Sequence, residues 1–302
     1  MSKVWKLRAI SVALAAAIAG SAMAFVQRGV IYEALDKRPL PKLQEIDYYA
    51  EQIDQTYRVF VQLPPGYDES GPPYPVLYAT DGEAAMGLYD DVVLPLIRQR
   101  KIPEIITVSI GYKDVPTPIP FGQIVDPPTG EPAVLNAGAV RIRDYAPGAV
   151  EKLPHSGHAD EFLKFLVVKI IPFIDATYNT DVHDRCIAGH SLGGLFSFYA
   201  QLRAPDTFNR CIATSPSLFW ADRDIFDREE AFSKEHTEWN TRLYLGAGSE
   251  DTPILSQTFQ LMTDTLEKRD YANLTWTSEW HRGKNHMSVV RPAITAGLEF
   301  VY

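Results

Sequence analysis

Short hydrophobic and β-branched runs alternate along most of the chain with longer segments of helical periodicity. The runs that predict strands are 57–63, 75–80, 105–110, 186–188, 211–213, 242–245 and 274–278. The segments that predict helices are 159–174, 192–202, 255–269 and 291–302. This alternation is typical of the α/β class, with a mainly parallel central sheet and helices on both faces. We therefore predict one domain over residues 46–302, preceded by a polar, proline-containing arm at 25–45.

Two segments interrupt the alternation. Residues 113–157 are proline-rich and contain Arg141, Arg143 and Asp144, and residues 216–239 are aromatic and charged. Long loops without secondary structure usually have a function, and loops at the carboxyl ends of strands surround the ligand crevice of an open α/β sheet. We predict that both segments form walls of a substrate site; ordinary surface packing is the alternative.

The first 24 residues have the composition of a targeting signal. Three basic residues (Lys3, Lys6 and Arg8) precede an apolar run at 9–18, and Ala-Met-Ala at 22–24 provides a small-residue cleavage site. The alternative is an uncleaved anchor helix, but the run is well short of the roughly 20 residues that span a bilayer. We therefore predict a signal peptide at 1–24, a periplasmic or secreted mature protein that begins near residue 25, and no stable membrane insertion after cleavage.

Composition narrows the classes of partner. The 302 residues are 46% hydrophobic and 22% charged, as in ordinary globular proteins, and the net charge of −9 becomes −12 without the three basic residues of the signal. This charge disfavours nucleic acid as a partner, because binding phosphates requires clustered Lys and Arg. Metal-ligand spacings and the glycine-rich nucleotide motifs are missing, so we predict neither a metal nor a cofactor.

The chain has two cysteines, Cys186 and Cys211, and each opens a similar hydrophobic stretch. Both are predicted to be buried strand residues. An oxidising compartment would allow a disulfide between them, but we expect two thiols.

The clearest chemical signal is Gly-His-Ser-Leu-Gly-Gly at 189–194, which follows a predicted strand and opens a predicted helix. This context is that of a nucleophile elbow, in which a tight turn exposes a serine hydroxyl. Gly189 and Gly193 remove side chains that would clash in the turn. We predict Ser191 as the nucleophile and the backbone N–H of Leu192 as an oxyanion donor.

A serine nucleophile needs a histidine as its base and an acid that orients the histidine. In α/β proteins with a nucleophile elbow, the acid follows the serine in the sequence and the histidine follows the acid. His286 lies after a predicted strand and just before the last helix, where a loop at the carboxyl edge of the sheet should carry the base. His281 is the fallback, whereas His236 lies among residues typical of a solvated face. The acid should follow the strand at 242–245, where Asp251 is preferred over Glu250; a Ser–His dyad without either acid is the further alternative.

A second oxyanion donor should come from the loop after the strand at 75–80. The sequence there is Asp81-Gly82-Glu83, and the N–H of Glu83 is the candidate. The alternative is a plain β-turn.

Several motifs together resemble the esterase-D-like "putative esterase" family of α/β hydrolases. They are Leu-Pro-Pro-Gly-Tyr at 63–67, Tyr-Pro-Val-Leu-Tyr at 74–78 leading to Asp81-Gly82, Ile-Pro-Phe-Ile at 171–174, the elbow at 188–194, and Ser-Pro-Ser-Leu-Phe-Trp at 215–220. The resemblance covers roughly residues 46–302. Arg-Asp-Tyr-Ala-Pro at 143–147 is similar to a segment of the periplasmic siderophore (enterobactin-type) esterase branch, which makes that branch the nearest relative.

The resemblance implies the α/β-hydrolase fold and a triad of Ser191, Asp251 and His286. It supports Glu83 as a donor and places Phe219 and Trp220 in an aromatic substrate wall, and it suggests Arg143 as a substrate-binding residue. The acidic mature surface would suit a trianionic ferric siderophore only if Arg141 and Arg143 concentrate positive charge locally.

We predict an exported serine esterase that hydrolyses a small-molecule carboxylic ester through an acyl-enzyme, with siderophore-type, aryl and acyl esters as candidate substrates. An acyltransferase that uses the same intermediate is the first alternative. A binding protein that has lost catalysis is the second, because a fold does not guarantee a function. The sequence leaves the oligomeric state open.

Overall fold

The computed structural model describes residues 38–113, 115 and 137–302. The predicted signal peptide, the arm up to residue 37 and most of the first half of the 113–157 segment lie outside the described residues.

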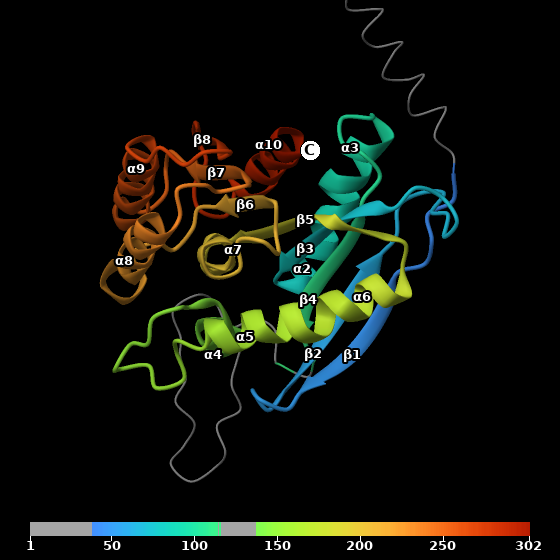
Figure 1. Cartoon of the computed structure of the whole chain (residues 1–302), viewed down its shortest axis with the longest axis horizontal. Coiled ribbons are helices and arrows are strands. Elements are labelled where there is room, and N and C mark those ends of the chain that lie inside the picture. Colours follow the sequence, from blue (N-terminus) through green and yellow to red (C-terminus); the bar gives the residue numbers. More distant parts are fainter. Residues whose placement is uncertain (1–37, 114, 116–136) are drawn as a thin grey trace, which may run out of the picture.

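Eight strands form one sheet in the order β1-β2-β4-β3-β5-β6-β7-β8 (Figure 1). Their bounds are β1 Gln44–Ala50, β2 Gln55–Gln62, β3 Tyr74–Thr80, β4 Ile106–Tyr112, β5 Thr180–His190, β6 Arg210–Thr214, β7 Arg242–Gly248 and β8 Thr275–His281. The pairs β1–β2 and β2–β4 are antiparallel, and every pair from β4 through β3 to β8 is parallel. The predicted class, α/β with a mainly parallel sheet, is confirmed.

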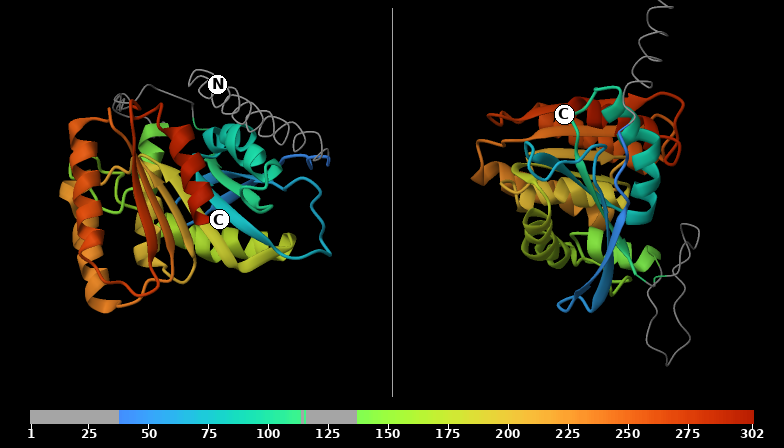
Figure 2. Two further views of the ribbon diagram at one scale, coloured as in Figure 1. Left: turned by 90° about the horizontal axis from the view of Figure 1, so that it is seen from above. Right: turned by 90° about the vertical axis from the view of Figure 1, so that its right-hand side faces the viewer.

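Helices cover both faces of the sheet, as predicted. Their bounds are α2 Gly82–Leu88, α3 Leu94–Arg98, α4 Ala137–Tyr145, α5 Ala159–Phe165, α6 Ile171–Thr177, α7 Leu192–Arg203, α8 Trp220–Glu235, α9 Pro253–Glu267 and α10 Val290–Val301. Helices α3 and α10 lie on one side of the sheet, and α5, α6 and α7 lie on the other (Figure 1). Two further views show the twisted sheet running between these layers (Figure 2).

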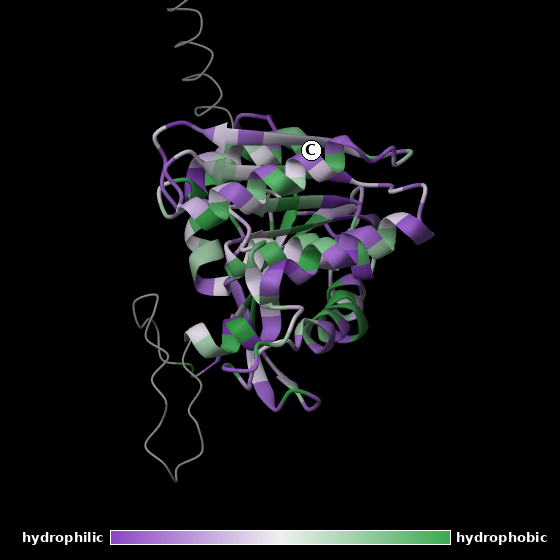
Figure 3. Ribbon diagram, turned by 90° about the vertical axis from the view of Figure 1, so that its left-hand side faces the viewer, coloured by the Kyte–Doolittle hydropathy of each residue, from purple (hydrophilic) through white to green (hydrophobic). Residues whose placement is uncertain are grey.

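The buried side chains form two clusters, one on each face of the sheet. Figure 3 shows hydrophobic residues along the central strands, whereas hydrophobic and hydrophilic residues alternate along the helices. The two cysteines belong to different clusters: Cys186 faces α3 and α10, whereas Cys211 faces the α7 side. Cys211 pairs in register with Ile187, so the two thiols point to opposite faces and stay unbonded, and burial raises the pKa of both.

All the predicted strands and helices are present, and the structure adds elements that the sequence pattern did not predict. Strand β1 begins at Gln44, inside the predicted arm. The segments 113–157 and 216–239, predicted as loops, contain α4 and the 16-residue α8. The predicted helix at 159–174 is interrupted by a π-helical turn, Leu166–Ile170, just before Pro172. A second such turn, Tyr89–Val93, precedes Pro95; each proline lacks the N–H that would continue the regular hydrogen-bond ladder.

The loops that follow the parallel strands carry the predicted chemistry. Asp81 follows β3, Ser191 follows β5, Ser215 follows β6, Asp251 follows β7 and His286 follows β8. Because carboxyl ends of parallel strands share one edge, the fold brings residues far apart in sequence to the same side of the sheet.

Candidate active site

Ser191 occupies the turn between β5 and α7, with φ 60° and ψ −119° and 3% of its surface exposed. A non-glycine residue with positive φ is strained, and such residues concentrate at functional sites. A Cβ on Gly189 would collide with the backbone of Gly193, and a Cβ on Gly193 would collide with the hydroxyl of Thr80. The two glycines therefore permit a turn that any side chain would block.

The two predicted oxyanion donors lie at helix N-termini. Leu192 is the first residue of the 12-residue helix α7, and Glu83 is the second residue of α2. The first N–H groups of a helix have no acceptor within it and carry the positive end of its dipole. Both groups can therefore donate to an anion, while the side chain of Glu83 lies against Gly111.

Helix α4 holds the turn that precedes Glu83. Asp81 has left-handed backbone angles (φ 59°, ψ 56°) and forms a two-point ion pair with Arg141, with Nε–Oδ1 at 2.6 Å and Nη2–Oδ2 at 3.1 Å. The N–H of Asp81 also donates to the hydroxyl of Tyr145 at 3.1 Å. Arg141 and Tyr145 are one helical turn apart, so a single face of α4 fixes this turn.

Asp251 and His286 lie together. The Nδ1 atom of His286 is 3.0 Å from Oδ1 of Asp251, and the Asp251 side chain has no exposed surface. The hydroxyl of Ser215 donates to the other carboxylate oxygen at 2.6 Å. Of the two adjacent acids, the structure pairs Asp251 with the histidine and leaves Glu250 exposed.

The end of β6 and the segment after it contribute three hydroxyls to which the sequence reasoning gave no role. Thr214 Oγ1 lies 3.0 Å from Nδ1 of His190, Ser215 holds Asp251, and Ser217 Oγ lies 3.3 Å from Oγ of Ser191. Ser215 has φ 39°, a strained backbone, and its N–H donates to the carbonyl of Gly246 at 2.6 Å. The sequence signal was the motif at 215–220, which indicated a pocket lining but not these contacts.

His190 packs against His286, with ring centroids 4.6 Å apart. Burial lowers the pKa of His190 to about 3, and the neighbouring His286 and Arg141 act in the same direction. His190 is therefore neutral at physiological pH and presents an uncharged ring to His286.

The residues predicted to bind substrate, Phe219, Trp220 and Arg143, lie in different environments. Phe219 and Trp220 are half-buried at the start of α8, and the indole N–H of Trp220 donates to the carbonyl of Gly148 at 2.7 Å. Arg143 does not match its prediction, because its side chain is 8% exposed and paired with Asp144 at 2.6 Å. The cation that lies beside the elbow region is Arg141, through its ion pair with Asp81.

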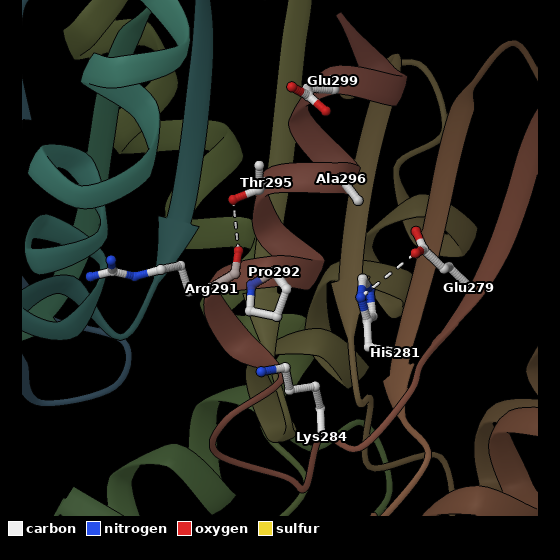
Figure 4. A pocket seen from close by; sticks show the side chains of 8 residues that line it. All are labelled: Glu279, His281, Lys284, Arg291, Pro292, Thr295, Ala296 and Glu299. Carbon is white, nitrogen blue, oxygen red and sulfur yellow. Dashed lines mark hydrogen bonds and ion pairs between the residues drawn. The ribbon is translucent and has the colours of Figure 1, made fainter. Parts of the chain in front are cut away.

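The two other candidate histidines lie elsewhere. His236 stacks on Phe232 at the end of α8, with ring centroids 4.1 Å apart. His281 is buried on β8, with Nε2 2.9 Å from the hydroxyl of Tyr244, and lines a groove between β8 and α10 (Figure 4). In that groove Glu279 also bonds Tyr244, Arg291 pairs with Asp91, and Glu299 pairs with Lys101, so these charges already have partners.

Within the described ranges, no group of three or more His, Cys, Asp or Glu side chains could hold a metal ion. Over the same residues, no helix is both long and apolar enough to cross a membrane.

The sequence is similar to that of known esterases. A family model described as "Putative esterase" matches residues 50–289. The ferri-bacillibactin esterase BesA of Bacillus subtilis is 28% identical over 275 residues, which is 82% of this chain and 85% of the relative. An apo-salmochelin esterase of Escherichia coli is 29% identical over 220 residues, covering 66% and 62% of the two chains.

Solved structures show the same architecture. The BES protein from Bacillus cereus superimposes with a TM-score of 0.72 at 21% identity, covering 88% of this chain and 98% of that one. The predicted resemblance to the family, nearest its siderophore esterases, is confirmed by these matches. The chain belongs to the "Putative esterase" family and is an ester hydrolase on the α/β-hydrolase fold.

Proposed function

We propose that this protein is an exported serine esterase that works through an acyl-enzyme on Ser191. The observation that carries the proposal is the hydrogen bond between Asp251 and His286, on loops at the same sheet edge as the strained Ser191 turn. A carboxylate at Nδ1 fixes the imidazole so that Nε2 is the proton acceptor. This arrangement supports a full triad over the Ser–His dyad.

In the proposed reaction Ser191 attacks the ester carbonyl while His286 takes its proton, and His286 then returns the proton to the leaving alcohol. The N–H groups of Leu192 and Glu83 would donate to the oxyanion, and the helix dipole of α7 would favour the negative charge. Water then adds to the acyl group and releases the acid. Phe219 and Trp220 would form an apolar wall for the acyl or alcohol part.

For the substrate we propose an ester of the siderophore type, on the strength of the siderophore esterases among its relatives. Charge favours the iron-free form over a trianionic ferric complex. The net charge is −9, and Arg141 and Arg143 are already paired with Asp81 and Asp144. Residues 114–136 add only acidic charges, with no Lys or Arg.

The test is hydrolysis of matched substrates by the purified mature protein and its Ser191→Ala variant. We expect release of acid from siderophore trilactones and simple aryl esters, faster for the iron-free than for the ferric trilactone, and lost in the variant. Added acceptor alcohol should leave acid as the main product. Diversion of most product to a new ester would instead establish an acyltransferase, and equal activity in the variant would refute Ser191 as nucleophile.

A further inference from the structure

The hydroxyl of Ser217 lies against the hydroxyl of Ser191, with 3.3 Å between the two Oγ atoms. Both side chains are buried, at 4% and 3% exposure. The N–H of Ser217 also donates to the carbonyl of Ser191 at 3.0 Å, so a main-chain bond fixes the position of the hydroxyl. Among the described residues, Ser191 is the one hydrogen-bond partner of the Ser217 hydroxyl.

The direction of this hydrogen bond follows from the neighbouring contacts, given the proposed function. Nδ1 of His286 faces the Asp251 carboxylate, which accepts only, so Nδ1 carries the proton and Nε2 is the nitrogen with the lone pair. In the proposed reaction the proton of Ser191 goes to Nε2. The lone pairs of Ser191 Oγ then remain as acceptors, and Ser217 is the donor.

We propose that Ser217 is a catalytic residue for deacylation, in which it donates a hydrogen bond to Ser191 Oγ as that atom leaves the acyl group. This inference rests on the proposed function. Water adds to the acyl carbonyl and gives a proton to His286. The carbon–Oγ bond then breaks, its electron pair goes to Oγ, and His286 returns the proton to Oγ, while Ser217 keeps its own proton.

The contact should matter more for deacylation than for acylation. A fixed donor stabilises the negative charge that builds on Oγ when it departs. In acylation the same donor holds electron density on the attacking oxygen and makes it less nucleophilic, which offsets part of the gain. Because the site is buried, water does not readily replace the lost donor.

The experiment compares wild type, Ser217→Ala, Ser217→Thr and Ser197→Ala with p-nitrophenyl acetate. Ser197 is the matched control, because it is a fully buried serine close to the elbow. Within the part of the chain that the structure describes, its hydroxyl bonds only the main-chain carbonyl of Gly193. Rates are normalised to the fraction labelled by a fluorophosphonate, burst kinetics separate acylation from deacylation, and intact mass measures the acyl-enzyme.

We expect Ser217→Ala to slow deacylation about tenfold, with acylation within about threefold of wild type, so that acyl-enzyme accumulates. Ser217→Thr keeps a hydroxyl and should deacylate faster than the alanine variant. Ser197→Ala should have the same ratio of acylation to deacylation rate as the wild type. Equal slowing of both steps, or no change in either, would overturn the role of Ser217. A wild type with neither label nor acyl-enzyme would instead refute the proposed function itself.

Discussion

At the residue scale, the Asp251 carboxylate has a partner on each oxygen: His286 on one and Ser215 on the other. Because the side chain is wholly buried and bonded on both oxygens, its orientation is fixed, and little water screens its charge from the imidazole. Glu250, its exposed neighbour, has no comparable contact in the described residues.

We predict that Asp251→Asn lowers kcat/KM by about 10³- to 10⁴-fold, because an amide would favour the wrong tautomer of His286. Glu250→Gln is the matched control and should stay within about threefold, as exposed substitutions usually do. Steady-state kinetics with an aryl ester measure kcat/KM for both variants and the wild type. A larger loss for Glu250→Gln than for Asp251→Asn would mean that Glu250, and not Asp251, orients His286.

A second prediction at this scale concerns Arg143, whose guanidinium pairs with the buried Asp144. Arg143→Met leaves the fully buried Asp144 without its cation, and burial already raises the pKa of that carboxyl against the opposing effect of Arg143. We expect the free energy of unfolding to fall by about 3–5 kcal/mol. Urea unfolding measures the loss, and adding Asp144→Asn should recover part of it. A raised KM at unchanged stability would restore Arg143 as a substrate-binding residue.

How far single residues could be predicted depends on how local their signal is. Ser191 and Leu192 stand in a short motif whose backbone geometry follows from glycine spacing, so their placement at a helix start could be predicted. The sequence indicated the loop of Glu83 but not the short helix α2 that begins there. The contacts of Ser215 and Ser217 depend on where β6 lies relative to β5 and β7, which no local pattern encodes. Arg143 and Arg141 were indistinguishable in sequence because they are two residues apart and both lie on α4.

At the scale of elements, α2 packs its first residue directly on strand β4. A Cβ on Gly82 would lie 2.8 Å from Cα of Gly111 and 2.9 Å from the carbonyl carbon of Ile110, both main-chain atoms that have no room to yield. A Cβ on Gly87, in the same helix, would meet no neighbouring segment of the described chain within 4 Å. Alanine substitutions at Gly82 and Gly87 therefore distinguish the cost of a packing clash from the effect of helix propensity.

We predict that Gly82→Ala costs about 1–3 kcal/mol of stability and also lowers kcat, because α2 must move and take the Glu83 N–H with it. Gly87→Ala should raise stability by up to about 1 kcal/mol with unchanged kcat. Urea unfolding and kcat are measured on the same samples. A fall in stability for Gly82→Ala without any change in kcat would argue against Glu83 as an oxyanion donor.

Helix α8 and strand β1 were not predicted, for different physical reasons. Near its start, helix α8 has three consecutive residues of positive φ, Ala221, Asp222 and Arg223, and its sequence is mostly charged, so hydrophobic periodicity does not predict it. Its position is set by tertiary contacts, including the bond from Arg228 to the Pro147 carbonyl. Strand β1 is largely exposed, which weakens the hydrophobic alternation that reveals a strand.

At the scale of the whole molecule, the half-buried His190 links stability to pH. Its folded-state pKa is lowered to about 3, whereas an unfolded histidine titrates near 6.5. Between these values the unfolded chain binds a proton that the folded protein does not. The contribution of His190 to stability is therefore complete above pH 6.5 and falls as the pH drops toward 3.

We predict that lowering the pH from 7 to 5 costs the wild type about 2 kcal/mol more in unfolding free energy than it costs His190→Gln. Other titrating groups are common to both proteins and cancel in this difference. Urea unfolding at the two pH values gives the result. Equal losses in both proteins would mean that His190 is not held neutral by the fold.

If Ser191 is an activated nucleophile, a fluorophosphonate should bind it covalently, and intact mass measures the adduct. We expect one adduct on the mature wild type and none on Ser191→Ala, with slower labelling of Asp251→Asn. A folded wild type that takes up no adduct, or a Ser191→Ala variant that is labelled as fast as wild type, would show that Ser191 is not the activated nucleophile.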